Sequence, residues 1–290
     1  MIQPLEIHYD VRGYDCGYGG SLKPFAIANF FQETAGAHAA TLGIGMEDMW
    51  ARGLTWMLSR IDIRIESMPR QGQRVIVRTW PSGTKRLFAQ RCLELVSESG
   101  KKYAGAVYEY IIVEMATRRV LRPERNLPLD LSTDYSWPFD DLEPGIDALP
   151  FKALEPPESG QRETYRALGE DGGASGERAS DERSIGGSNE PASDNFRRVF
   201  SLEARARHMD YNGHVNNAHF INWLCDTVPL GENQRFQRIK VDFVHEILHG
   251  ETLRVWGKKS GETEWLAAIT GTEGIAARGH FLTAAIDASQ

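Results

Sequence analysis

The sequence predicts an α+β fold built from two tandem units, each a hydrophobic helix wrapped by an antiparallel sheet. Two observations support this prediction. Stretches with alternating apolar residues, typical of half-buried strands, occur in both halves of the chain and superimpose at a constant offset. In each half, a turn and a helix-like apolar pattern precede these stretches. The chain therefore contains a diverged internal repeat.

Each repeat begins with a turn and a helix. Residues 18–22 (Tyr-Gly-Gly-Ser-Leu) align with residues 211–215 (Tyr-Asn-Gly-His-Val), and residues 25–31 align with 218–224. Large apolar side chains recur at helical spacing in both helix segments, which predicts that they are buried. These side chains are Ile27, Phe30, Phe31, Phe220, Trp223 and Leu224.

Strands follow each helix. Residues 60–65 and 72–77 align with 238–243 and 250–255, with a glycine at the start of each second segment. Alternation on both sides of a glycine-containing turn predicts a hairpin in each half. A long sheet around one helix, formed twice, is a double hotdog, and two such units side by side would give one continuous sheet. We expect the later strands near residues 74–80, 88–97 and 103–114, and near 252–257, 264–270 and 275–283.

The repeat also sets the predicted domains. Residues 1–130 form the N-terminal hotdog, 131–198 a connector and 199–290 the C-terminal hotdog. Within the connector, residues 156–195 are rich in Gly, Ser and charged residues and carry few large apolar side chains. Such a segment cannot bury enough surface to offset the entropy of ordering, so we predict a flexible insertion there. Residues 131–155 are expected to pack.

Composition excludes several classes of function. The hydrophobic content of 41% and charged content of 25% are those of a folded soluble protein. A net charge of −7 argues against non-specific nucleic-acid binding. Neither a signal peptide nor an apolar run long enough to span a membrane is present. The three cysteines are far apart and form no CxxC pair, which predicts reduced thiols and a cytoplasmic location.

The most informative stretch is residues 210–217, Asp-Tyr-Asn-Gly-His-Val-Asn-Asn. It places Asp210, Asn212 and His214 at alternate positions just before the second helix. A histidine beside the N-terminus of a helix is suited to acid–base chemistry on a carbonyl group. The first copy of this turn has Gly19 and Ser21 where the second has the amide and the imidazole. We therefore expect chemistry in the second half and a substrate cavity walled by the first.

Four further residues are candidates for substrate contact. Asn216 and Asn217 are expected to cap the second helix by satisfying backbone donors, with substrate orientation as the alternative. Trp56 and Phe30 are large side chains near the first helix. They are expected to shape the cavity or to be ordinary core.

Residues 245–249 read His-Glu-Ile-Leu-His, the literal motif of a zinc protease. The motif binds zinc only on a helix, where both histidines share one face. Here it follows a strand pattern, and His245 and His249 on an extended chain would be about 13 Å apart, at ~3.3 Å per residue. We therefore expect neither a metal nor any other cofactor. Glu246 remains of interest, because at the end of that strand it can approach His214.

These residues resemble the signatures of the acyl-acyl-carrier-protein thioesterase family. Residues 210–217, followed by Trp223, resemble the central signature, and residues 241–246 resemble a second one that ends in glutamate. The likeness covers roughly residues 1–150 and 196–290. It implies that Asp210, Asn212, His214 and Glu246 are catalytic. One departure is clear: Ile247 stands where many relatives have a cysteine after the glutamate.

The resemblance implies hydrolysis of a fatty acyl thioester of acyl carrier protein, which releases fatty acid and holo-acyl carrier protein and ends fatty acid synthesis. Backbone N–H groups and the Asn212 amide would stabilise the oxyanion. Glu246 or Asp210 would activate water with help from His214, or a carboxylate would attack directly. Two arginine clusters are candidate docking sites for the acidic carrier: Arg197, Arg198, Arg205 and Arg207, and Arg118, Arg119, Arg122 and Arg125.

Three alternatives stay open at this stage. A hotdog thioesterase acting on coenzyme A esters would use the same catalytic set. A non-catalytic acyl-binding protein would not need Asn212, His214 and Glu246 together. A dehydratase usually places its histidine and acid differently. Since hotdog sheets often pair, a homodimer is also an expectation.

Overall fold

The structure, a computed structural model, describes residues 2–17, 19–146 and 196–286. The predicted insertion at 156–195 lies outside the described residues. The first strand after it is β7. In the N-terminal half the elements are β1 (Leu5–Asp10), α1 (Pro24–Thr41), α2 (Met46–Trp50), β2 (Leu54–Ile65), β3 (Arg74–Lys85), β4 (Phe88–Ser97), β5 (Lys102–Glu114), β6 (Val120–Leu121) and α3 (Pro123–Asn126). In the C-terminal half they are β7 (Arg197–Glu203), α4 (Asn217–Cys225), β8 (Gln234–Phe243), β9 (Thr252–Lys259), β10 (Glu264–Gly271) and β11 (Gly274–Ala285).

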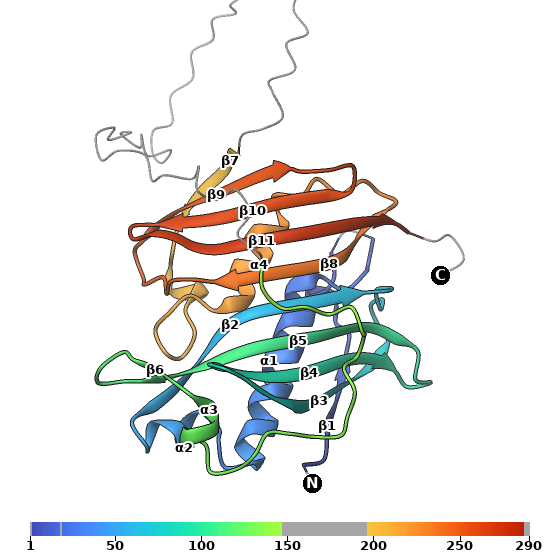
Figure 1. Cartoon of the computed structure of the whole chain (residues 1–290). Helices are drawn as coiled ribbons and strands as arrows, with labels where there is room; N and C mark the ends of the chain where they lie inside the picture. The colour runs from blue at the N-terminus through green and yellow to red at the C-terminus, as the bar shows by residue number, and fades with distance from the viewer. Residues whose placement is uncertain (1, 18, 147–195, 287–290) are drawn as a thin grey trace, which may run out of the picture.

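The described strands form one antiparallel sheet that runs through both halves (Figure 1). Its order is β1-β3-β4-β5-β2-β8-β11-β10-β9-β7, with β6 paired to the end of β5. The predicted α+β double hotdog with a continuous sheet is confirmed. Because β7 begins at Arg197, the predicted boundary at residue 198 falls inside this strand.

The predicted hairpins are wrong. β2 pairs with β5 and β8, and β8 pairs with β2 and β11, so neither strand pairs with the one that follows it in the sequence. In each half the chain instead crosses from one side of the unit's sheet to the other, through residues 66–73 and 244–251. Alternating apolar residues show that a segment is a half-buried strand, but they do not say which strand it pairs with. The second crossing segment contains Glu246 and lines the larger cavity, whereas the first lines neither cavity described below.

The two halves meet at the antiparallel pair β2–β8. Ile61 pairs with Val241 and Ile63 with Ile239, and all four are almost fully buried. On this pair of strands Arg238 also donates from Nε and Nη2 to the two carboxylate oxygens of the buried Asp62, at 2.9 and 2.6 Å. Removing one partner of such a buried pair typically costs about 3–5 kcal/mol, so this contact fixes the halves to each other.

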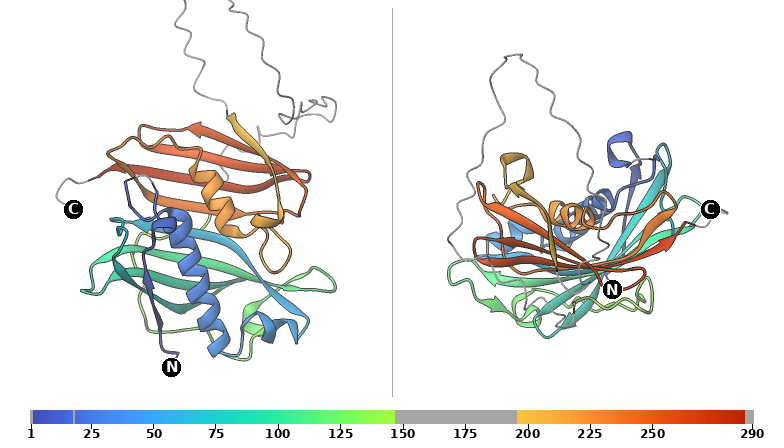
Figure 2. Two further views of the ribbon diagram at one scale, coloured as in Figure 1. Left: turned by 180° about the vertical axis from the view of Figure 1, so that it is seen from behind. Right: turned by 90° about the horizontal axis from the view of Figure 1, so that it is seen from above.

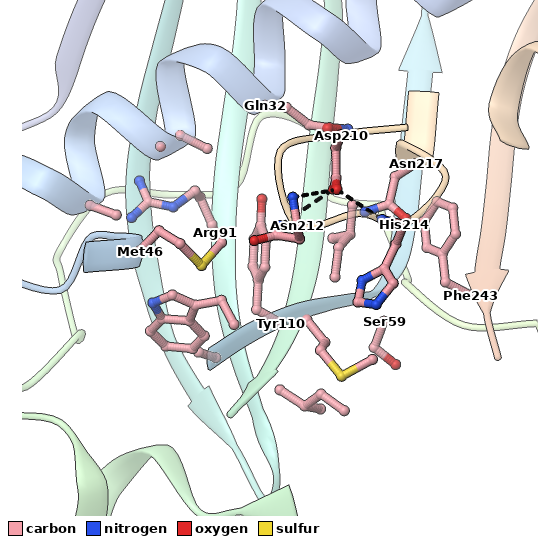
Figure 3. A pocket seen from close by; sticks show the side chains of 18 of the residues that line it. Gln32, Met46, Ser59, Arg91, Tyr110, Asp210, Asn212, His214, Asn217 and Phe243 are labelled. Carbon is pink, nitrogen blue, oxygen red and sulfur yellow. Dashed lines mark hydrogen bonds between the residues drawn. The ribbon is translucent and has the colours of Figure 1, made fainter. Parts of the chain in front are cut away.

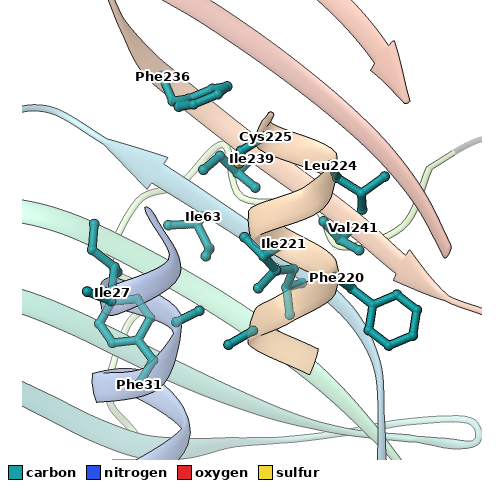
Figure 4. Close-up of a cluster of buried hydrophobic side chains, with 14 of the residues drawn as sticks. Ile27, Phe31, Ile63, Phe220, Ile221, Leu224, Cys225, Phe236, Ile239 and Val241 are labelled. Atoms are coloured by element: carbon teal, nitrogen blue, oxygen red, sulfur yellow. The ribbon is translucent and has the colours of Figure 1, made fainter. Parts of the chain in front are cut away.

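Both long helices lie on the same face of the sheet (Figure 2). Pro24 at the first turn of α1 suits a helix start, because that position has no N–H partner to lose. The two helices pack against each other and against the central strands, through Ile27 and Phe31 of α1 and Ile221 and Leu224 of α4 (Figure 4). Burying each such side chain contributes about 1.5–3 kcal/mol. This shared core holds the turn before α4 beside the N-terminal half.

The described part of the connector, up to residue 146, covers the other face of the sheet. Trp137 and Phe139 pack on a small cluster that contains Trp80, Cys92 and Val107. A Cβ atom at Gly105 would lie 2.5 Å from Pro138 and 2.7 Å from Phe139, so the connector approaches the sheet closely there. Among the helices of the described residues, none is long and apolar enough to cross a membrane.

Candidate functional site

The turn before α4 is organised by Asp210. One of its carboxylate oxygens accepts from the backbone N–H groups of Asn212, at 2.8 Å, and His214, at 3.3 Å. The other oxygen faces the Asn212 side-chain amide at 3.4 Å. Gly213 has φ +81°, which a residue with a side chain rarely adopts. Because both Asp210 oxygens hold the loop, this carboxylate serves to position Asn212 and His214.

The segment that crosses from β8 to β9 brings Glu246 to this turn. The backbone N–H of Val215 donates to the carbonyl of Ile247 at 3.0 Å, and an antiparallel bridge joins His214 to Leu248. Glu246 Oε2 then lies 3.3 Å from His214 Nε2. Residues 245–247 are not helical, so His245 and His249 do not share one helix face as in a zinc protease. The predicted approach of Glu246 to His214 is what the structure shows.

The first half contains the same backbone arrangement without the chemistry. Leu22 N–H donates to the carbonyl of Pro69 at 2.9 Å, and a bridge joins Ser21 to Arg70. In the alignment of the repeats Ser21 stands for His214, and Met68 stands for Glu246. Both copies of the repeat therefore share this backbone arrangement, but only the second copy carries the imidazole and the carboxylate.

Arg118 also reaches Glu246, from the other half of the molecule. Its Nη2 donates to Glu246 Oε2 at 2.9 Å, so one oxygen atom contacts both the guanidinium and the His214 ring. Arg118 lies in the turn between β5 and β6 and has φ +59°, which costs a non-glycine residue on the order of 1 kcal/mol. We interpret this strained position as the means of directing Arg118 at Glu246. The sequence had placed Arg118 in a docking cluster, since nothing in it shows a contact across 128 residues.

A cavity of about 350 Å³ opens beside the turn before α4 and Glu246. Asp210, Asn212, His214 and Glu246 all line it, as the sequence predicted for a shared site. Figure 3 shows Arg91 and Met46 on the opposite side, with Tyr110 between them and Asn212. The wall from the N-terminal half includes Gln32, Ala35, Gly36 and Ala39 of α1, Trp56 and Leu58 of β2, Arg91 of β4 and Tyr110 of β5. Both halves are therefore needed to make this space.

A second cavity, of about 330 Å³, reaches the same residues from another direction. Trp50, Met115, Arg118 and Tyr211 line it together with Asn212, His214 and Glu246. Trp50 and Tyr211, one from each half, stack with ring centroids 5.2 Å apart. Since Tyr211 is 72% exposed and Met115 is 48% exposed, this second cavity is the solvent side of the site.

Of the four candidates for substrate contact, two line the larger cavity, one caps α4 and one packs elsewhere. Trp56 and Asn217 line the larger cavity. Asn216 is the N-cap of α4, and its side-chain oxygen accepts from Ala218 N–H at 2.9 Å. Phe30 lies outside both cavities and stacks on Tyr9, with ring centroids 4.5 Å apart, so its prediction as a cavity residue is wrong. Helical spacing predicted that Phe30 is buried, but the side chain is only partly buried, and spacing does not indicate on which side of α1 the ring packs.

No reactive thiol competes with this site among the described residues. Ile247, which stands where many relatives have a cysteine, is 2% exposed and packs into the core. Cys225 is buried in α4, and burial raises its pKa well above the ordinary value for a thiol. Neither position therefore offers a thiolate to this site.

Comparison with known proteins agrees with the sequence motifs and the fold. The family model described as "Acyl-ACP thioesterase N-terminal domain" matches residues 5–127, and "Acyl-ACP thioesterase C-terminal domain" matches residues 192–284. The chain is 24% identical over 278 residues to oleoyl-acyl carrier protein thioesterase 1 of Arabidopsis thaliana, covering 93% of this chain and 66% of that protein. It is 21% identical to the palmitoyl-acyl carrier protein thioesterase of the same plant, covering 82% and 51%. The chain thus spans about half to two thirds of the length of these relatives.

Two solved structures share the fold. An acyl-ACP thioesterase from Bacteroides thetaiotaomicron has a TM-score of 0.71 at 20% identity, covering 97% of this chain and 98% of that one. The 12:0-ACP thioesterase from Umbellularia californica has a TM-score of 0.69 at 17% identity, covering 97% of each chain. With both domain models matched over most of the sequence, this chain belongs to the acyl-ACP thioesterase family.

Proposed function

We propose that this protein hydrolyses the thioester of a fatty acid with acyl carrier protein, releasing the fatty acid and the free carrier thiol. The observation that carries the proposal is the contact of His214 with Glu246, 3.3 Å apart at the mouth of a cavity formed by both halves. The plant relatives named above are acyl carrier protein thioesterases, which supports the same substrate class.

In this proposal water is the nucleophile and Glu246 is the general base. The thioester carbonyl lies beside Asn212 and the N-terminus of α4, where the amide and backbone N–H groups stabilise the oxyanion. Glu246 takes a proton as water adds to the carbonyl carbon, and His214 passes a proton to the sulfur as the C–S bond breaks. Asp210 is less suited to be the base, because both of its oxygens already accept hydrogen bonds within the loop. Arg118 holds Glu246 from the other side.

Substitution of the two central residues tests this mechanism. His214→Ala and Glu246→Gln proteins are expected to lose at least about a hundredfold in kcat for release of fatty acid from acyl-acyl carrier protein, while keeping the wild-type melting temperature. The matched control is Ser21→Ala, at the position equivalent to His214 in the first copy, which should leave kcat unchanged. Near wild-type turnover in the His214→Ala protein would contradict the proposal.

The same assay distinguishes the proposed function from two alternatives, a coenzyme A thioesterase and a non-catalytic acyl-binding protein. A coenzyme A thioesterase would release the same acyl chain faster from coenzyme A than from the carrier. An acyl-binding protein would retain a fatty acyl chain without releasing free acid. The proposal requires a higher kcat/KM with the carrier-linked ester.

Docking of the acidic carrier is proposed for the arginine cluster on the β5–β6 side of the solvent-facing cavity. Arg119, Arg122 and Arg125 follow Arg118 along the chain, next to the opening that Arg118 lines. Charge reversal by Arg122→Glu should raise KM for carrier-linked substrate and leave KM for a small thioester unchanged. An equal effect on both substrates would argue against docking there. The cytoplasmic location and the homodimer remain predictions, and sedimentation of the purified protein would test the latter.

A further inference from the structure

The wall of the larger cavity opposite the catalytic set contains a buried cation. Arg91, on β4, lines this cavity and is 7% exposed. Its Nη1 donates to His38 Nδ1 at 3.0 Å and to Thr79 Oγ1 at 3.2 Å. Among the described residues no carboxylate forms an ion pair with Arg91, and its Nε and Nη2 have no hydrogen-bond partner.

The groups around Arg91 do not neutralise its charge. Burial, followed by the charge of Arg91 itself, lowers the pKa of His38 to about 4, so His38 is neutral at pH 7. Thr79 is a neutral hydroxyl, and burial raises the pKa of Tyr110 to about 12. An isolated buried charge is costly unless an opposite charge or a ligand pairs with it. The cavity is therefore short of one anion on this side.

A second side chain of the same half lines the cavity and carries a donor without a partner. Gln32 of α1 lines the cavity, and its Nε2 is buried with no hydrogen-bond partner among the described residues. In Figure 3 Gln32 extends from α1 toward the Asp210 loop, whereas Arg91 lies on the far side of Tyr110. A plain hydrocarbon chain between these two places would satisfy neither donor. A chain with an acceptor group would satisfy Arg91 at its far end.

We propose that the cavity accepts an acyl chain ending in a carboxylate, which Arg91 binds at the end remote from the thioester. Nε and Nη2 lie on one edge of a guanidinium, and this edge matches the two oxygens of a carboxylate. A hydroxyl or keto group could accept one hydrogen bond but would leave the charge unpaired. This inference rests on the proposed thioesterase function and names a substrate class that differs from the palmitoyl and oleoyl chains of the plant relatives.

The test compares two carrier-linked thioesters of equal chain length, one ending in a methyl group and one in a carboxylate. Wild-type protein should show a kcat/KM about tenfold to a hundredfold higher for the carboxylate-ended chain, as expected for a charge-assisted pair. Arg91→Met should abolish or reverse this preference. The control is Arg78→Met, because Arg78 pairs with Glu6 on the exposed side of β3 and does not line the cavity. It should keep the wild-type ratio.

Each outcome decides one of the two proposals. A wild-type protein that prefers the methyl-ended chain overturns the carboxylate site and leaves the thioesterase function intact. Failure to hydrolyse either ester refutes the thioesterase function instead. If Arg91→Met does not fold, a smaller change at the same position provides the comparison. Arg91→Gln then removes the charge while keeping a donor, and an unchanged ratio in whichever uncharged variant folds would overturn the carboxylate site.

Discussion

Acidification should destabilise this protein through His38. The ring is 3% exposed, and burial together with the adjacent Arg91 lowers its pKa from 6.5 to about 4. The unfolded chain keeps the ordinary value and therefore binds a proton over a pH range in which the folded protein does not. The stabilisation contributed by neutral His38 is thus fully present above pH 6.5 and is lost as the pH falls toward 4.

The shift of this pKa sets the size of the effect. It corresponds to about 3 kcal/mol of unfolding free energy in total, of which about 2 kcal/mol is lost between pH 7 and pH 5. His208 and His219 titrate in the same direction, because burial lowers both of their pKa values. The pH dependence of the wild-type protein alone would therefore contain the contributions of several histidines to the unfolding free energy. A matched variant is needed to separate that of His38.

Urea denaturation of wild-type and His38→Gln proteins at pH 7, 6 and 5 isolates His38. His208 and His219 are present in both proteins, so their contributions cancel in the difference. The wild-type protein should lose about 2 kcal/mol more than the variant between pH 7 and pH 5. A difference between the two proteins that stays constant over this range would refute the assignment of a buried neutral His38.

Three further substitutions test the placement of individual side chains. Arg118→Met should lower kcat about tenfold with little change in melting temperature, because exposed ion pairs stabilise weakly while Glu246 loses one of its two contacts; steady-state kinetics with a thermal melt measures both. Asn216→Ala should cost about 1 kcal/mol of unfolding free energy in urea denaturation and spare kcat, as expected for a helix cap. Phe30→Leu should lower stability by about 1 kcal/mol through loss of the Tyr9 stack and leave acyl-chain preference unchanged in the thioester panel.

The sequence predicted the fold well because each unit repeats its own pattern. Alternation in residues 60–65 and 238–243 identified β2 and β8, and helical spacing identified α1 and α4. The prediction of which strands pair was wrong, because a glycine turn after a strand does not distinguish a hairpin from a crossing segment. In both halves the segment after the strand packs against the turn before the helix, a long-range contact that local sequence does not encode.

The site was predictable where its residues belong to one short motif or to the repeat. Asp210, Asn212 and His214 lie within one turn, and Glu246 was placed by its position at the end of a strand. Arg118 and Arg91 act through contacts with the opposite half or with another element, 128 and 53 residues away in sequence. An exposed arginine in a charged run and a buried arginine in a strand look alike in one sequence, so the roles proposed for them rest on burial and geometry.

The structure also explains why the duplicated frame carries one site. His214 and Glu246 have Ser21 and Met68 as their counterparts, so the first copy lacks both an imidazole and a carboxylate. α1 has 18 residues and α4 has 9, and the additional turns of α1 run along the cavity. Small residues face the cavity there, and a Cβ atom at Gly36 would meet no atom within 4 Å. The first copy therefore lines much of the cavity but lacks the imidazole and the carboxylate of the second copy. Most of the cavity wall comes from the first half, whereas His214 and Glu246 come from the second, and the β2–β8 pair and the packing of α1 against α4 hold the two together.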